Sequence, residues 1–83
     1  MSRKIPALRP KKLLRALLRA GFFVHYQKGS HIQLRNYSNP KLRVTIPFHT
    51  RFDLPPSVIK SILNQAEISR EEVLNFLSKN KKI

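Results

Sequence analysis

The sequence contains no cysteine, no tryptophan and only two glycines. The lack of cysteine excludes a disulfide scaffold and thiolate metal sites, and it suits a reducing compartment, so a cytoplasmic protein is expected. No apolar run approaches the roughly 20 residues that cross a bilayer, so no membrane partner is expected. We predict a single domain over residues 1–83, with a short basic lead at 1–8 and a frayed basic tail at 79–83.

Acidic residues are the other scarcity. There are four against 17 lysines and arginines, which gives a net charge of +13. The first carboxylate is Asp53, and residues 1–52 hold twelve of the basic residues. Self-repulsion at this charge destabilises the compact state, and a polyanion relieves it. The charge alone fits three kinds of partner, namely nucleic acid, an anionic membrane surface or an acidic protein, and of these we expect nucleic acid and an acidic protein but no membrane.

The hydrophobic pattern predicts an α+β domain. Leucines at helical spacing follow Pro10, and Gly21 is a natural helix stop. Alternating apolar residues then predict strands over 22–26, 31–35 and 42–46, joined by short turns into an antiparallel sheet. A second helix begins near Pro56, and the capping-box spacing of Ser69 and Glu72 starts a short last helix. We expect the helices to cover one face of the sheet.

Two basic surfaces follow from this pattern. The polar side of the first helix carries four cations, which either bind phosphate or are only solvated: Lys11, Lys12, Arg15 and Arg19. The uncovered face of the sheet would present a polar and basic surface built from His31, Gln33, Arg35, Arg43 and Thr45. The stripe of leucines on the first helix is assigned to the core.

His31 is the residue that best fits a catalytic role. It opens a strand directly after the turn Gly29-Ser30, and Lys28 precedes that turn. RNA cleavage needs no protein nucleophile, because the 2′-hydroxyl attacks the neighbouring phosphate once a base removes its proton. A histidine titrates near neutral pH and can be that base, while nearby cations stabilise the phosphoryl oxygens. The alternative is an ordinary exposed strand residue.

The remaining candidates are less specific. No ligand spacing of a known metal motif is present, so we expect no metal and no cofactor. His49 lies in a loop and is a candidate proton donor for the leaving 5′-oxygen, and Lys28 is a further auxiliary candidate. His25 is expected to be a packed or edge histidine. Tyr26 and Tyr37 either stack on bases or are buried.

The chain resembles the HicA family of toxins, which are small mRNA interferases. The similarity covers most of the domain and rests on five segments: a first helix ending at Gly21-Phe22, the turn Lys28-Gly29-Ser30-His31, the stretch Arg43–His49, Leu54-Pro55, and Ile59–Ala66. The spacing of these segments is more specific than the short turn alone. Two positions depart from the family pattern, since Ile32 stands where a second polar residue is frequent and Glu67 where glycine is common.

The resemblance implies a double-stranded-RNA-binding-domain-like fold, helix–three strands–helix, with a short extra C-terminal helix here. It also implies metal-independent cleavage of mRNA with His31 as the catalytic residue. Gly29 and Ser30 would let a phosphate approach the turn, and the RNA-binding cations would be Lys11, Lys12, Arg15, Arg19, Lys28, Arg35 and Arg43. A HicB-like antitoxin would bind the toxin and cover the site, and release from it would arrest growth.

Two other functions compete with the toxin ribonuclease. One is a non-catalytic RNA-binding domain, which would hold duplex RNA through its phosphates and 2′-hydroxyls. The other is an interaction protein whose charge serves only an acidic partner. The histidine at the turn distinguishes the toxin ribonuclease from the non-catalytic RNA-binding domain, because a pure RNA-binding protein would favour lysine or arginine at that position.

Overall fold

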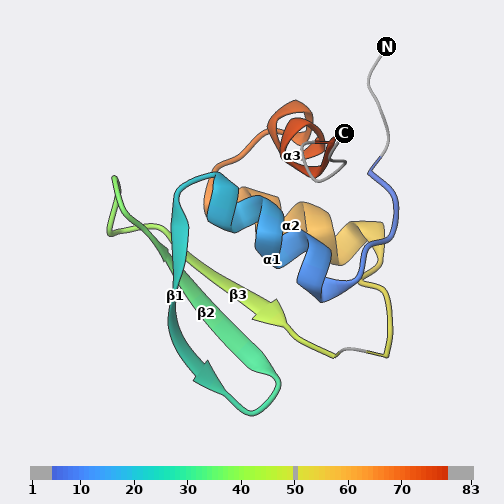
Figure 1. Cartoon of the computed structure of the whole chain (residues 1–83), viewed down its shortest axis with the longest axis horizontal. Coiled ribbons are helices and arrows are strands. Elements are labelled where there is room, and N and C mark those ends of the chain that lie inside the picture. Colours follow the sequence, from blue (N-terminus) through green and yellow to red (C-terminus); the bar gives the residue numbers. More distant parts are fainter. Residues whose placement is uncertain (1–4, 50, 79–83) are drawn as a thin grey trace.

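The computed structural model describes residues 5–49 and 51–78 (Figure 1). The spacing of its leucines, together with Pro10 at its start and Gly21 after its end, defines the first helix. Helix α1 spans Pro10–Arg19, with Pro10 in its first turn, where a missing N–H costs nothing. Leu13 and Leu17 are fully buried. Gly21 follows the Ala20 cap at φ +100°, a conformation that favours glycine, so the predicted helix stop is confirmed.

Three antiparallel strands follow in the order β1-β2-β3: β1 Phe22–Lys28, β2 His31–Asn36 and β3 Arg43–Pro47. Cross-strand pairs place Ile32 beside Ile46 and Leu34 beside Val44, and all four side chains are buried. Figure 1 shows the helices on one side of the sheet, as expected. The other side, which we call the open face, is not covered by any helix of residues 5–49 and 51–78.

Two helices complete the core. Helix α2 spans Pro56–Ala66 and packs against β3, and helix α3 spans Arg70–Ser78 and packs against α1. The expected capping box opens α3: the Ser69 N–H donates to a Glu72 carboxylate oxygen at 3.0 Å, and the Glu72 N–H donates to the Ser69 hydroxyl at 3.1 Å. The predicted α+β order is therefore confirmed. Across residues 5–49 and 51–78, no helix combines the length and apolar character that crossing a bilayer requires.

The predicted N-terminal lead packs against the domain from residue 5 onward. Ile5 and Leu8 are buried in the core. The backbones of Leu8 and Leu54 exchange two hydrogen bonds, so the segment before α1 is tied to the segment before α2. Arg9 and Asp53 form an ion pair at 2.8 Å beside this bridge. Residues 1–4 and the predicted tail at 79–83 lie outside the described residues.

The predicted strand ends need correction. Strand β1 continues to Lys28, two residues beyond the predicted end, because the two-residue turn Gly29–Ser30 lets the hairpin pair up to its tip. Strand β3 begins at Arg43, and Leu42 lies just before it, half-buried against the core. Phe76 and Leu77 of α3 are half-buried against the core, whereas Val73 of the same helix is fully buried.

A β-bulge in β1 could not be expected from the alternation of residues. Val24 pairs with Leu34, but the next pair joins Tyr26 to Gln33, so His25 is the extra residue. One inserted residue reverses the parity of every side chain that follows it. Tyr26 therefore shares the open face with Gln33, whereas unbroken alternation would turn it toward the core.

Glu67 provides a test of backbone strain. It caps α2 at φ +56° and ψ +42°, the left-handed region, which costs a residue with a Cβ about 1–2 kcal/mol. Replacing it in Glu67→Gly should therefore raise the free energy of unfolding by about 1 kcal/mol in urea titrations. Glu67→Ala is the control, because it removes the carboxylate and keeps the Cβ. Equal stabilisation by both variants would assign the effect to charge instead.

Gly29 provides a second test. It adopts φ +57° at the first position of the β1–β2 turn, and an added Cβ would meet no atom within 4 Å. Any cost of substitution is therefore conformational rather than steric. We expect Gly29→Val to lower the free energy of unfolding by more than about 1 kcal/mol, and Gly29→Asn by clearly less, since asparagine tolerates left-handed backbone. Equal losses in thermal or urea unfolding would contradict this account.

Candidate functional site on the open face of the sheet

The open face is organised in three cross-strand rows. Because directly paired residues point to the same side of a sheet, the registers define each row. From the turn inward, the rows are Lys28–His31–Pro47, Tyr26–Gln33–Thr45 and Phe23–Arg35–Arg43. Successive rows lie about 7 Å apart along a strand. The predicted site residues on the sheet, His31, Lys28, Arg35 and Arg43, are therefore brought together on one surface.

His31 stands at the edge of this surface as the first residue of β2, with its side chain exposed. Both neighbouring strands pair with β2 at His31 and hold its backbone in place. Lys28 is its partner across the turn in β1, and Pro47 is its partner in β3. The Phe48 N–H also donates to the Ser30 carbonyl, which ties the turn to the chain that leaves β3. An exposed imidazole on an anchored backbone is what a proton-transfer group requires.

A hollow of about 570 Å³ lies directly beside His31. Its lining comes from the turn and the first two rows of the open face: Tyr26, Lys28, Gly29, Ser30, His31, Gln33 and Thr45. The volume falls within the roughly 300–1,000 Å³ of sites that bind small ligands. The lining combines an aromatic ring, an ammonium group, an imidazole, an amide and two hydroxyls, so it can hold a group that is both planar and polar.

The electrostatics of the face favour an anion. The four acidic residues of the chain lie at position 53 or beyond, so the sheet carries none. Arg35 and Arg43 are directly paired across β2 and β3, and like charges in this position repel. The Arg35 Nε is buried and has no hydrogen-bond partner among the described residues. A phosphate beside these two guanidinium groups would offset their mutual repulsion.

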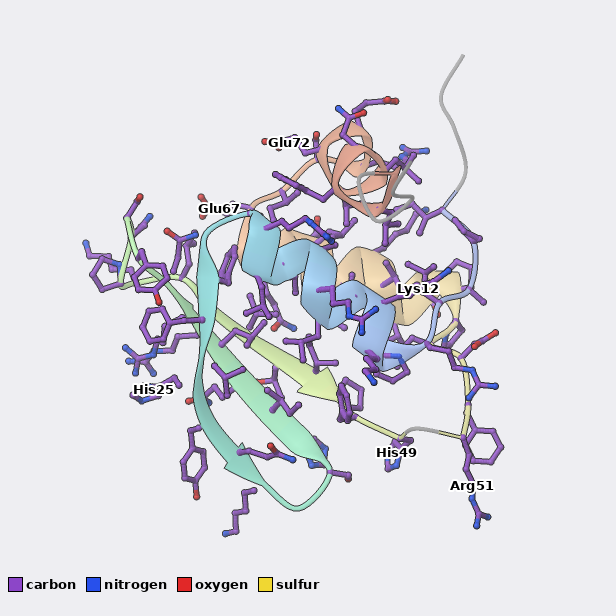
Figure 2. All side chains as sticks on the ribbon, in the orientation of Figure 1. Lys12, His25, His49, Arg51, Glu67 and Glu72 are labelled. Atoms are coloured by element: carbon purple, nitrogen blue, oxygen red, sulfur yellow. The ribbon has the colours of Figure 1, made fainter. Side chains whose placement is uncertain are left out.

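The other two histidines lie at opposite edges of the sheet. His49 is exposed in the loop after β3, two residues beyond Pro47, the partner of His31. His25 is exposed at the bulge of β1, an edge strand, so the expectation of an edge histidine fits and that of a packed one is wrong. Figure 2 shows both side chains directed away from the sheet. Of these two, His49 lies at the end of β3 that meets His31.

The predicted cations of the first helix form a separate surface. Lys11, Lys12, Arg15 and Arg19 are exposed on α1, whose buried side packs against the sheet. Figure 2 labels Lys12 on the helical layer. These four residues and the open face are on different sides of the molecule. A small ligand beside His31 would therefore not contact the cations of α1.

Two residues of this region were missed by the sequence analysis. Phe23 packs against Tyr37 in a tilted ring contact, with ring centroids 4.6 Å apart. The only signal for this position is the alternation of side chains, because Phe23 must face away from the core if its neighbour Phe22 is buried. Gln65 of α2 accepts a hydrogen bond from the Thr45 N–H at 3.1 Å, across the outer edge of β3. This contact had no sequence signal, because it joins residues that only the tertiary fold brings together. It occupies a backbone donor that an edge strand would otherwise leave free.

Metal-binding groups are dispersed over the described part of the chain. Within residues 5–49 and 51–78, no three histidine, aspartate or glutamate side chains are close enough together to hold an ion.

Comparison with known protein families gives a match. A family model described as the HicA toxin of bacterial toxin–antitoxin matches residues 10–68, from the start of α1 to just beyond α2. That segment contains the whole sheet, the turn and the hollow. A search of curated proteins finds no match. Because the family model covers well over half of the 83 residues, the chain belongs to the HicA family of toxins of bacterial toxin–antitoxin systems.

Proposed function

We propose that the protein is a toxin that cleaves mRNA, with His31 as the general base. The observation that carries the proposal is the position of His31: an exposed imidazole beside a ligand-sized hollow, on a face with cations and no carboxylate. Membership of the HicA family supports the same activity. The reaction needs no metal, because the RNA supplies its own nucleophile.

The chemistry proceeds by transesterification. His31 takes the proton of a 2′-hydroxyl, and the 2′-oxygen attacks the adjacent phosphorus. The bond from phosphorus to the 5′-oxygen breaks, which leaves a 2′,3′-cyclic phosphate on one product. The departing 5′-oxygen takes a proton and becomes a hydroxyl. Lys28, opposite His31 in the first row, is placed to stabilise the charge on the phosphoryl oxygens. His49 and Lys28 are the two candidates for the proton donor.

Inhibition by a HicB-like antitoxin belongs to the same proposal. An acidic antitoxin surface would be attracted to the basic open face, and by covering the hollow it would exclude RNA. The second candidate function is a non-catalytic RNA-binding domain. It is favoured by the cations on α1, which lie away from His31 and would bind phosphate without any part in cleavage.

Removal of the base should abolish cleavage. We expect His31→Ala and His31→Gln to lose the cleavage of a long RNA in excess EDTA by at least about 10²-fold, with folding and RNA binding retained, because general base catalysis contributes about 10²–10⁴-fold. Gel analysis would measure the rate, and end-group analysis should show 2′,3′-cyclic phosphate or 3′-phosphate ends in the wild type only. His25→Ala is the matched control, as it removes another exposed strand histidine. Full activity of both His31 variants would exclude this mechanism.

Phosphate contacts should appear in the salt dependence of binding. We expect Arg43→Gln to weaken the binding of a 2′-O-methyl RNA, and to reduce the slope of log K against log salt concentration by about 0.7, the value for one phosphate contact with a single strand. Lys12→Gln measures the same quantity for the surface of α1. Lys60→Gln is the control, because it removes one exposed charge from α2. Equal slopes for wild type and Arg43→Gln would remove Arg43 from the RNA surface.

A further inference from the structure

We propose that the open face binds RNA as a single strand, with one base stacked on the ring of Tyr26 in the hollow beside His31. This inference rests on the proposed function and specifies how its substrate is held. It assigns recognition to unpaired bases and gives Tyr26 a direct contact with the substrate.

The first observation is the exposure of Tyr26 on the side of the sheet that carries His31. The ring is 54% exposed and lines the hollow. It reaches this side only because of the bulge at His25, which pairs Tyr26 with Gln33 rather than with a core residue. Bulges commonly redirect a side chain next to a functional site. The sheet therefore presents an aromatic ring one row from the histidine.

The second observation is the chemistry of the hollow. The row of Tyr26 also contains Gln33 and Thr45, which line the same hollow with an amide and a hydroxyl. A base stacked on the ring would place its hydrogen-bonding edge near these two groups, which can both donate and accept. The next row holds Lys28 and His31, which suit the phosphate and the ribose 2′-hydroxyl of the same nucleotide. One nucleotide thus fits the chemistry of two adjacent rows.

The third observation is a second aromatic position further along the face. Phe23 and Tyr37 are in ring contact, and Tyr37 is 74% exposed. Phe23 shares its row with Arg35 and Arg43, the repelling pair. From the turn inward the face therefore offers a histidine with a lysine, then an aromatic ring, then two guanidinium groups beside a second aromatic pair. Aromatic and cationic side chains thus continue along the face beyond the hollow, in rows about 7 Å apart.

The fourth observation is the form of RNA that such a face accepts. Bases in a duplex are already stacked on each other and cannot reach a protein ring, whereas unpaired bases can stack on aromatic side chains and bind in positively charged grooves. The open face has rings and cations in alternation, a combination typical of single-strand binding. The cations on α1, where no aromatic residue occurs within Pro10–Arg19, lack this combination.

The test is the binding of a short 2′-O-methyl RNA, which cannot be cleaved, to the intact wild-type protein and its variants by fluorescence anisotropy. Stacking on one aromatic side chain corresponds to about 5- to 100-fold in affinity. We expect that loss for Tyr26→Leu, little loss for Tyr26→Phe, and none for the control Phe52→Leu, which removes another exposed ring outside the sheet. A 2-aminopurine base placed along the strand should be quenched on binding at one position, and Tyr26→Leu should remove that quenching.

Competition with unlabelled RNA completes the test, and we expect the single strand to compete far better than its duplex. Equal affinity of wild type and Tyr26→Leu, or tighter binding of the duplex, would overturn the inference. The outcome is separable from that of the proposed function. Cleavage that depends on His31 but not on Tyr26 would leave the ribonuclease and exclude the stacking site. Tyr26-dependent binding without any cleavage would keep the stacking site and exclude the ribonuclease.

Discussion

The burial of one side of the sheet determines the position of every candidate functional group. Ile32, Leu34, Val44 and Ile46 are almost completely removed from solvent beneath the helices. Because side chains alternate along a strand, burial of these residues forces His31 and Arg35 onto the opposite side. A slip of one residue would exchange the two sides and bury charged groups without partners, at a cost of several kcal/mol. The hydrophobic core thus fixes the register of the site.

The β1–β2 hairpin refines that placement at its two irregular points. The turn at Gly29 brings Lys28 directly opposite His31, which a longer loop would not do. The bulge at His25 then changes the parity of β1, and the ring of Tyr26 joins the open face. At the far side of the sheet, the Gln65 side chain covers a donor of the edge strand β3. The turn and the bulge thus place side chains on the open face, while Gln65 occupies a backbone donor at the edge of β3.

Much of this architecture follows from the sequence because it depends on local periodicity. The helical spacing of Leu13 and Leu17, the alternation around Ile32, and the capping box at Ser69 each predict the element in which they are found. The order of elements and the surface shared by His31, Arg35 and Arg43 were predicted for the same reason. Each of these patterns extends over only a few consecutive residues of the chain.

The remainder could not be predicted, because it depends on contacts between distant segments. Ile5 is buried because it meets the core formed by the rest of the chain, although two basic residues directly precede it in the sequence. The bulge at His25 is set by how β1 must fit β2, and no alternation signals it. The two basic surfaces, by contrast, were predicted from helical spacing and strand parity, and the packing of α1 on the sheet puts them on different sides of the molecule.

The charge of the site also constrains how its ligands can be told apart. Repulsion between Arg35 and Arg43 persists in the free protein, and any polyanion that binds the folded state stabilises it by mass action. RNA and an acidic antitoxin would both give that stabilisation, since each supplies negative charge to the same face. A rise in melting temperature therefore reports an anion and not its identity. Discrimination must come from groups that act on shape and bonding rather than charge. On this face the proposed groups are His31, which would take a proton from the substrate, and Tyr26, whose ring would stack on a planar base.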